Sequence, residues 1–343
     1  MSQKAKARWK LILNLVTFIA LIAMVYILRH QILESLSNLG RVNAWALLLM
    51  FPLQYLNYHA YTQQYRAILN IFSERIRYRS MFRVVLELNF INNVFPSGGV
   101  SGFSYFSLRM KDAEVSGAKA SLTHLLRFIL VFVAFQVFLL VGLVMLAIGG
   151  QANGLVLLVS GSLATLILVG TLGIGVVIGS KRRIHAFFGF VAKVLNKIIH
   201  VVRPKHPETI NMERAEKTFE ELHENFMVIQ KDYSVLKRPL KWSLLANLTE
   251  VLTVYTVYVA FGHWVNPGAV ILAYAVANFA GFISVLPGGV GIYEALMTAV
   301  LAACGIPPGL SIPVTVMYRV LNSTIQLPPG WVLYHRRIRQ LSP

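Results

Sequence analysis

A series of long apolar segments constrains this chain most, because a helix needs about 20 mostly apolar residues to cross a lipid bilayer. Six segments reach that length: Leu11–Leu28, Ala44–Tyr65, Ser121–Ile148, Leu155–Gly179, Trp242–Gly262 and Ser311–Tyr334. Only 13% of the 343 residues are charged, against about 25% in soluble domains. We therefore expect an all-α polytopic membrane protein. A disordered chain is excluded by the apolar content, and a disulfide scaffold is excluded because Cys304 is the only cysteine.

Two further apolar stretches are interrupted by proline and glycine. The first, Phe82–Met110, contains Asn92-Asn93 and Pro96-Ser97-Gly98-Gly99, and the second, Pro267–Gly305, contains Pro287-Gly288-Gly289. Proline and paired glycine end helices, and unpaired backbone in lipid costs several kcal/mol per group. We expect two broken, re-entrant helical hairpins buried among six full spans, or about eight membrane segments. The alternative is that one or both stretches cross the membrane fully.

The basic residues predict the orientation. The chain has 32 Lys and Arg against 14 Asp and Glu, and the cytoplasmic loops of membrane proteins carry an excess of Lys and Arg. One topology places 28 of the 32 on the cytoplasmic side, with both termini there. Arg29 and Arg41 fall outside, and Arg127 and Arg319 fall within spans. In this topology the two hairpins enter from opposite sides, in the inner, or cytoplasmic, cell membrane.

The sequence predicts a single transmembrane domain over residues 1–343, with a cytoplasmic insert at 181–241. Within the insert, Ile184–Val202 has the apolar spacing of an amphipathic helix lying in the lipid headgroup plane. Glu208–Val235 predicts a polar helix with a narrower apolar stripe. We favour a packed connector between two membrane halves over a partner-docking role. The insert has no catalytic or nucleotide motif.

The two breaks are similar to each other. Phe95–Gly102 reads FPSGGVSG and Leu286–Gly291 reads LPGGVG. Each break is followed by a helical segment and then by a span with an arginine, 31 residues after Pro96 and 32 residues after Pro287. This weak internal repeat suggests an inverted repeat, the plan by which secondary transporters place a binding site near the membrane midplane.

This pattern indicates an anion site. The start of a helix presents unpaired N–H groups, and glycine lets a phosphate oxygen approach them closely. Arginine binds phosphate bidentately, and an arginine inside a span usually faces the protein interior. The expected lipid-binding residues are Arg127, Arg319, Ser97, Gly98, Gly99, Ser101, Gly288, Gly289 and Glu294. No metal site or cofactor is expected.

A structural role is the alternative for each of these groups. Paired glycines often serve close helix packing, and an intramembrane arginine often pairs with an acid, here Glu87, Glu250 or Glu294. Glu294 could neutralise Arg319 or meet a cationic headgroup. His59 and His124 are expected to be interhelical hydrogen bonders. Polar neighbours of His59 predict a water-facing side of its helix: Gln54, Asn57, Tyr61 and Gln63.

Both breaks resemble the signatures of a known family. Asn93–Gly102 with Leu108-Arg109, and Leu286–Leu296 with Gly305 and Tyr318-Arg319, are similar to the transmembrane flippase-like domain of lysylphosphatidylglycerol synthase, the multiple peptide resistance factor, and its stand-alone relatives. The resemblance implies about eight membrane helices that move lipids with aminoacylated or anionic headgroups between leaflets. The chain ends at Pro343, soon after its last span, so we expect no synthase activity. In the family an acid often precedes the first intramembrane arginine, and Leu126 at this position argues against an Arg–Glu pair there.

We therefore expect a lipid transporter or flippase, not an enzyme, for a phospholipid or another lipid with a phosphate-containing headgroup. Its partners would be membrane lipids with anionic headgroups, together with a further copy or a lipid-modifying enzyme, and not nucleic acid. No ATP-binding motif is present, which favours downhill or gradient-coupled movement. One alternative is a membrane-embedded headgroup or glycosyl transferase acting on a phospholipid or polyprenyl phosphate. The other is an accessory subunit of an envelope-modifying enzyme.

Overall fold

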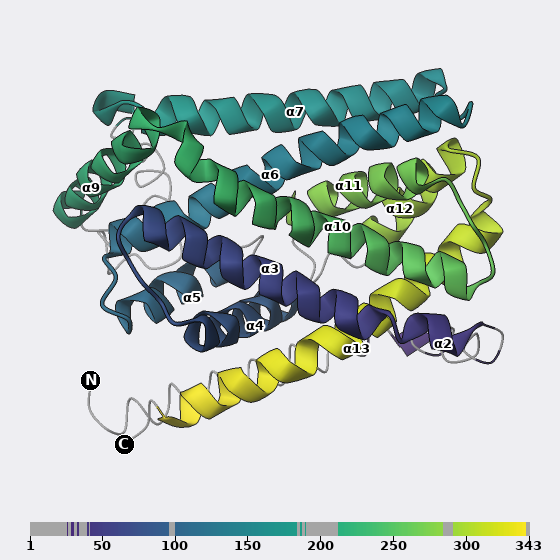
Figure 1. Ribbon diagram of the computed structural model, residues 1–343, viewed down its shortest axis with the longest axis horizontal. Helices are drawn as coiled ribbons and strands as arrows, with labels where there is room; N and C mark the ends of the chain where they lie inside the picture. Colours follow the sequence, from purple (N-terminus) through teal and green to yellow (C-terminus); the bar gives the residue numbers. More distant parts are fainter. Residues whose placement is uncertain are drawn as a thin grey trace, which may run out of the picture.

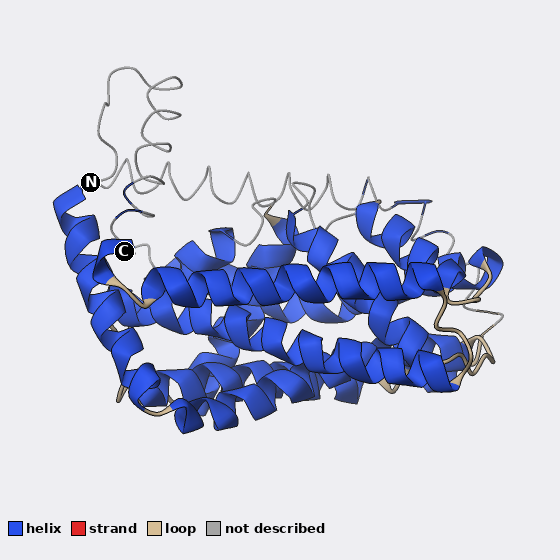
Figure 2. Ribbon diagram, turned by 90° about the horizontal axis from the view of Figure 1, so that it is seen from above, coloured by secondary structure: helices blue, strands red, loops and turns tan. Residues whose placement is uncertain are grey.

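The computed structural model describes residues 42–95, 100–183, 212–283 and 291–340, with a few isolated positions outside these ranges. The described part is helical, with turns between helices and no strand (Figure 2). The predicted span Leu11–Leu28 and nearly all of the predicted amphipathic helix Ile184–Val202 lie outside it. An all-α fold is confirmed for the described residues.

Three helical segments are long and apolar enough to cross a membrane: α6 (Gly117–Ile148), α7 (Gly154–Ile178) and Tyr233–Ala260, which joins the 3-10 turn η1 (Tyr233–Leu236) to α10 (Lys237–Ala260). They correspond to three of the six predicted spans. Two shorter apolar helices are α11 (Pro267–Ile283) and α12 (Ile292–Ala303). Large apolar side chains on α7 are exposed, such as Leu158 at 69% and Val169 at 62%. An apolar helix surface this exposed is suited to lipid rather than water.

The predicted span Ala44–Tyr65 is placed incorrectly. The chain forms the short helix α2 (Ala44–Leu47) and then α3 (Met50–Ile71), which continues six residues beyond Tyr65. The predicted water-facing side of α3 is also wrong at two positions. Gln54 and Asn57 are buried against α10, where the Asn57 amide donates to Thr249 Oγ1 at 3.0 Å. Polar residues on α3 therefore join two helices instead of meeting solvent.

Both interrupted stretches form pairs of short helices, as predicted. The first is α4 (Tyr78–Val94) followed by α5 (Val100–Lys111), and the second is α11 followed by α12. The last helix is α13 (Pro308–Gln340). The helices α3 to α6 contain 22, 17, 12 and 32 residues, and α10 to α13 contain 24, 17, 12 and 33. Within the described chain, two sets of four helices therefore follow each other with nearly the same lengths in the same order.

The two four-helix units, α3–α6 and α10–α13, also pack on each other through corresponding helices. The first helices, α3 and α10, lie side by side, α4 packs on α13, and α11 packs on α6 (Figure 1). Glycines allow the last two approaches. A Cβ at Gly330 of α13 would overlap the Leu86 carbonyl oxygen of α4, and a Cβ at Gly268 of α11 would overlap the Gly142 carbonyl oxygen of α6. The α4–α5 hairpin lies toward one end of the long axis and the α11–α12 hairpin toward the other (Figure 1).

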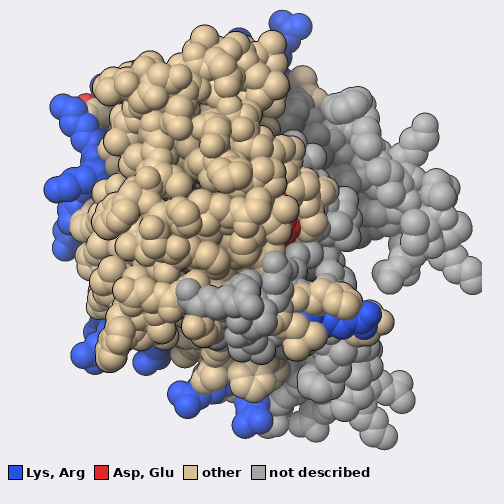
Figure 3. All heavy atoms as spheres, turned by 90° about the vertical axis from the view of Figure 1, so that its right-hand side faces the viewer, with Lys and Arg blue, Asp and Glu red and all other residues tan. Residues whose placement is uncertain are grey.

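The two ends of the molecule differ in charge. The turns 149–153, 261–266 and 304–307 gather at one end and contain no Lys, Arg, Asp or Glu. Figure 3 views that end, and the Lys and Arg side chains visible on it lie near its margin. The opposite end carries basic residues in its turns and at the C-terminal end of α13, among them Arg75, Arg77, Lys181 and Arg336. This separation matches the charge pattern from which the orientation was predicted.

The described part of the insert contains α9 (Met212–Lys231), which packs on α6 and α7. Phe226 and Ile229 are its buried anchors. The predicted helix Glu208–Val235 extends four residues too far, because Asp232 caps η1 by accepting the Ser234 N–H at 2.8 Å. The insert therefore packs against the membrane-length helices through Phe226 and Ile229, the residues of its apolar stripe whose side chains the structure describes.

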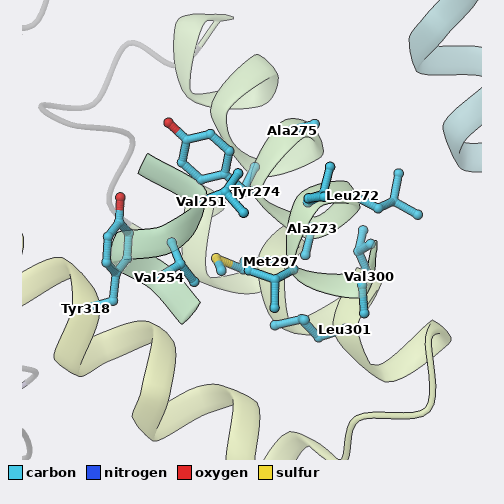
Figure 4. Close-up of a cluster of buried hydrophobic side chains, with 14 of the residues drawn as sticks. Val251, Val254, Leu272, Ala273, Tyr274, Ala275, Met297, Val300, Leu301 and Tyr318 are labelled. Atoms are coloured by element: carbon cyan, nitrogen blue, oxygen red, sulfur yellow. The ribbon is translucent and has the colours of Figure 1, made fainter. Parts of the chain in front are cut away.

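The second four-helix unit packs around a mainly aliphatic core, to which α6 and α7 also contribute. Val251 and Val254 of α10 meet Leu272 of α11 and Met297 of α12 in this cluster (Figure 4). The hydroxyl groups of Tyr274 and Tyr318 lie at one edge of the cluster and point away from it (Figure 4). Aromatic rings that keep their apolar bodies in a core place their polar ends at its boundary. That boundary is where the polar interior described below begins.

Candidate functional site

The two arginines predicted inside spans occupy equivalent positions in the two units. Arg127 is the eleventh residue of α6 and Arg319 is the twelfth residue of α13. At 1.5 Å per residue they lie roughly 15–17 Å from the start of their helices. Because α6 and α13 begin at opposite ends of the molecule (Figure 1), each arginine lies about one third of the way along its helix, counted from opposite ends.

Arg127 lies among aromatic rings. Its guanidinium carbon is 4.6 Å from the centroid of the Tyr61 ring, 5.3 Å from that of Tyr65 and 5.5 Å from that of Phe128. Within the described ranges, no carboxylate forms an ion pair with it, and its buried Nε has no hydrogen-bond acceptor. The residue before it, Leu126, is buried and apolar. Aromatic faces stabilise a cation but do not neutralise it, so Arg127 keeps its charge available to an anion.

Arg319 has a different environment. Its Nε lies 3.5 Å from Glu294 Oε1, and its guanidinium carbon lies 4.5 Å from the centroid of the Tyr293 ring. The side chains of Arg319 and Glu294 are 15% and 12% exposed. Glu294 also accepts the Gly291 N–H at 2.6 Å, which caps the start of α12, where Gly291 has φ 86°. The structure therefore pairs Glu294 with Arg319, one of the two roles expected for this acid.

The remaining predicted site residues belong to the breaks. Ser101 lies in the first turn of α5 and is partly buried. The other five lie outside the described residues: Ser97, Gly98, Gly99, Gly288 and Gly289. Contacts between their backbone N–H groups and a phosphate therefore stay predictions. What is placed is the start of the helix after each break, α5 in the first unit and α12 in the second.

Most other candidate acids and bases already have partners. Glu87 Oε2 contacts Arg109 Nε at 2.8 Å and accepts the Tyr105 hydroxyl at 2.9 Å. His59 Nδ1 lies 2.9 Å from the Tyr78 hydroxyl, and His124 Nδ1 lies 3.0 Å from the Tyr65 hydroxyl, which is the expected role of both histidines. Across the described ranges, no three His, Cys, Asp or Glu side chains cluster as a metal site.

The sequence interpretation missed the role of the tyrosines. Tyr61 and Tyr65 are four residues apart on α3 and present one helix face to Arg127. Tyr293 and Tyr318 directly precede Glu294 and Arg319 in the sequence, and their rings are stacked with centroids 6.5 Å apart. In the sequence, the i,i+4 spacing of Tyr61 and Tyr65 and the adjacent pairs Tyr293-Glu294 and Tyr318-Arg319 were the signals that these tyrosines line the charged site.

An apolar groove of about 400 Å³ lies between α12 and the start of α13. Small and aliphatic side chains form most of its wall, which is lined by Glu294, Ala295, Thr298, Ala299, Ala302, Pro308 and Ile312. Glu294 is its one charged lining residue and is the same acid that pairs with Arg319. A larger, polar cavity of about 490 Å³ lies at the α3–α4 turn, beside Arg66 and Arg75. The first groove thus connects apolar surface to the charged site.

Comparisons with known proteins agree with this architecture. The family model of the lysylphosphatidylglycerol synthase TM region matches residues 11–330. A UPF0104 membrane protein of Methanocaldococcus jannaschii is 23% identical over 336 residues, which are 96% of this chain and 95% of the relative. A UPF0104 membrane protein of Pyrococcus horikoshii is 24% identical over 247 residues, 71% and 72% of the two chains.

A UPF0104 membrane protein of Methanothermobacter thermautotrophicus is 36% identical over 80 residues, and this match spans about a quarter of each chain, 23% and 24%. The family model, in contrast, includes both breaks, both arginines predicted within spans, and the three membrane-length helices of the described residues. On this evidence the chain is a multi-pass integral membrane protein and belongs to the family of lysylphosphatidylglycerol synthase transmembrane regions.

Proposed function

We propose that this protein is a lipid transporter that moves a phospholipid, or another lipid with a phosphate-containing headgroup, between the leaflets of the cell membrane. The observation that carries the proposal is Arg127, which lies within the membrane-length apolar helix α6 and has no carboxylate ion pair in the described part of the chain. An arginine at the centre of a membrane costs about 2.5–3.5 kcal/mol on insertion scales. A phosphate that enters the site offsets this cost through bidentate hydrogen bonds.

The environment of the second arginine supports binding of a headgroup that carries both a negative and a positive charge. Arg319 is already paired with Glu294, so this site offers a cation and an anion side by side. A lipid phosphate would approach Arg319, while an amine of a zwitterionic or aminoacylated headgroup would approach Glu294. The apolar groove beside Glu294 would take part of an acyl chain, since its volume of about 400 Å³ is within the usual range of about 300–1,000 Å³.

The repeated helix lengths support alternating access. In our proposal the two four-helix units have opposite orientations in the membrane, with both termini cytoplasmic and about eight membrane segments in total. The basic end of the molecule would face the inside. The α4–α5 and α11–α12 hairpins would then open toward opposite sides, and the site between them would be reached from each leaflet in turn.

The direct test is reconstitution into liposomes that carry fluorescent phospholipids of several headgroups in both leaflets, followed by dithionite quenching from outside. Protein-free liposomes would lose about half of their fluorescence, and liposomes with active protein would lose nearly all of it. Unchanged quenching across all headgroups would refute the proposal. Formation of a new lipid species, detected by mass spectrometry, would instead support the transferase alternative.

Variants locate the activity in the site. Arg127→Leu and Arg319→Ala are expected to abolish transport while the protein remains monodisperse in detergent. Arg127→Lys is expected to retain part of the activity, because an ammonium keeps the charge but loses the bidentate geometry. Arg79→Leu is the matched control, since Arg79 is exposed at the start of α4. Wild-type transport by Arg127→Leu would mean that this cation has no role in binding.

A further inference from the structure

Glu250 differs from the other acids inside the helix bundle. It lies in the middle of α10 and is only 9% exposed. Its hydrogen-bonding contact is with the Tyr318 hydroxyl, which donates to Oε2 at 3.4 Å. Glu87 and Glu294 each contact an arginine, whereas no Lys, Arg or His in the described ranges forms an ion pair with Glu250. Among the residues that the structure describes, Glu250 is therefore a deeply buried carboxyl group without a cationic partner.

Phenol groups surround this carboxyl group. The titratable side chains within electrostatic range of it are Tyr58 and Tyr61 on α3, Tyr274 on α11, Tyr293 on α12 and Tyr318 on α13. The helix α6 faces the same region with Arg127, and α2 and η1, which also contact α10, contribute no charged residue of their own. Phenols donate hydrogen bonds but carry no positive charge at neutral pH.

Glu250 lies between the two arginine sites. The guanidinium of Arg127 lies over the ring of Tyr61, and Tyr61 is also a neighbour of Glu250. In the second unit, Tyr318 contacts Glu250 and stacks on Tyr293. The guanidinium of Arg319 lies over the ring of Tyr293. One tyrosine on one side and a stacked pair on the other therefore separate the carboxyl group from the two cations.

We infer that Glu250 is the proton-binding group of this transporter, and that a proton on Glu250 and a lipid phosphate at the arginines bind together. The inference rests on the proposed transport function. An ionised carboxylate buried without a cation is unfavourable and acts on both arginines through a medium of low dielectric constant. It would also repel an entering phosphate. Proton binding converts the carboxylate to the neutral acid and removes this repulsion, so each ligand favours the other by the same factor.

A hydrogen-bonded chain connects this group to the first break. The Asn322 amide donates to the Tyr318 hydroxyl at 3.5 Å, and the Gln326 amide donates to Asn322 Oδ1 at 3.2 Å. Asn89 of α4 donates to Gln326 Oε1 at 3.0 Å, and Asn93 donates to the Asn89 carbonyl at 2.9 Å. Asn93 lies one residue before the end of α4. The charge on Glu250 therefore acts at one end of a partly buried chain of polar side chains that joins both units.

The test measures proton uptake on lipid binding by the full chain in a weakly buffered detergent solution, with a short-chain phosphatidylglycerol as the probe. Wild-type protein is expected to take up roughly 0.4–0.85 proton per lipid bound, with the maximum at the pH midway between the titration midpoints of the free and the lipid-bound protein, for a coupling of about 5–150-fold. Its lipid affinity is expected to fall by about 5–150-fold from pH 5 to pH 8.5, the usual range of coupling between two ligands. For Glu250→Gln, we expect no proton uptake and an affinity that no longer changes with pH.

The control is Glu74→Gln, which alters a partly exposed acid paired with Lys119 and should keep the wild-type pH dependence. Wild-type binding without proton uptake, or equal uptake by Glu250→Gln, would overturn the inference even if liposome transport is observed. Absence of both lipid binding and transport would overturn the proposed function, and the inference with it.

A second measurement needs no variant. Dicyclohexylcarbodiimide reacts with protonated carboxyl groups in apolar surroundings, and peptide mass spectrometry locates the adduct. We expect modification at Glu250, faster at low pH and slowed by the bound lipid, and little at the ion-paired Glu87 and Glu294. An unmodified Glu250 across pH 5–8 would contradict its role as a proton-binding group.

Discussion

Substitution of Glu87 by alanine tests how the first hairpin is held. Glu87 is 3% exposed and accepts from Arg109 Nε at 2.8 Å and from the Tyr105 hydroxyl at 2.9 Å. Glu87→Ala leaves a guanidinium of 13% exposure and a phenol without their shared acceptor. Removal of one partner of a buried ion pair costs about 3–5 kcal/mol. Arg109 retains Asp112 at 3.7 Å, so we expect the lower end, about 3 kcal/mol.

The expected loss is large enough to measure by thermal unfolding. At about 2.1 cal/mol/K of unfolding entropy per residue, a chain of 343 residues shifts its melting temperature by roughly 1.4 °C per kcal/mol, so Glu87→Ala should lower it by roughly 4 °C. The assay is scanning fluorimetry of purified protein in one detergent. Glu74→Ala is the matched control, because the Glu74–Lys119 pair has side chains 27% and 29% exposed and such pairs contribute about 0.2–1 kcal/mol.

Removal of both charges of the pair should have the opposite effect. Replacement of both partners, Glu87→Leu with Arg109→Met, removes the buried charges together and should recover most of the lost stability. Equal melting temperatures for Glu87→Ala and Glu74→Ala would refute the assigned cost of the buried pair. A double variant less stable than Glu87→Ala would show that packing in the hairpin, and not charge, determines the loss.

Three further predictions concern packing and topology. Gly330→Ala should destabilise the protein by about 1–3 kcal/mol, because its Cβ would overlap α4, whereas Gly309→Ala, with open space around it, should not; thermal unfolding compares them. Burial raises the pKa of the Cys304 thiol to about 11, and Cys304 is 1% exposed. Maleimide labelling of the native protein should therefore be very slow at pH 7, and its rate should rise about tenfold per pH unit toward pH 9. In cells, cysteines introduced at Ser116 and Pro308 should react with impermeant maleimide from the cytoplasmic and the external side respectively, and labelling of both from one side would contradict the opposed hairpins.

The sequence interpretation was accurate where the determinants are local. Proline and paired glycine located both breaks, and the structure places a helix end before each and a new helix after it. Apolar composition identified α6, α7 and α10. It failed on α3, because Gln54 and Asn57 look like solvent-facing residues until α10 supplies their partners. Hydrogen bonds between helices nearly 200 residues apart leave no local signal.

By itself, the sequence determined that this chain is a helical membrane protein with two broken hairpins, two arginines within its apolar segments and one strongly basic side. These properties depend on residue type and on spacing along one helix, which the chain specifies directly. Only the tertiary structure decided that Arg319 has Glu294 beside it, that Arg127 has aromatic rings instead, and that Glu250 has a tyrosine as its hydrogen-bonding contact. The physical reason is that one residue rotates a side chain by about 100° around its helix, so partners on other helices depend on how the helices pack.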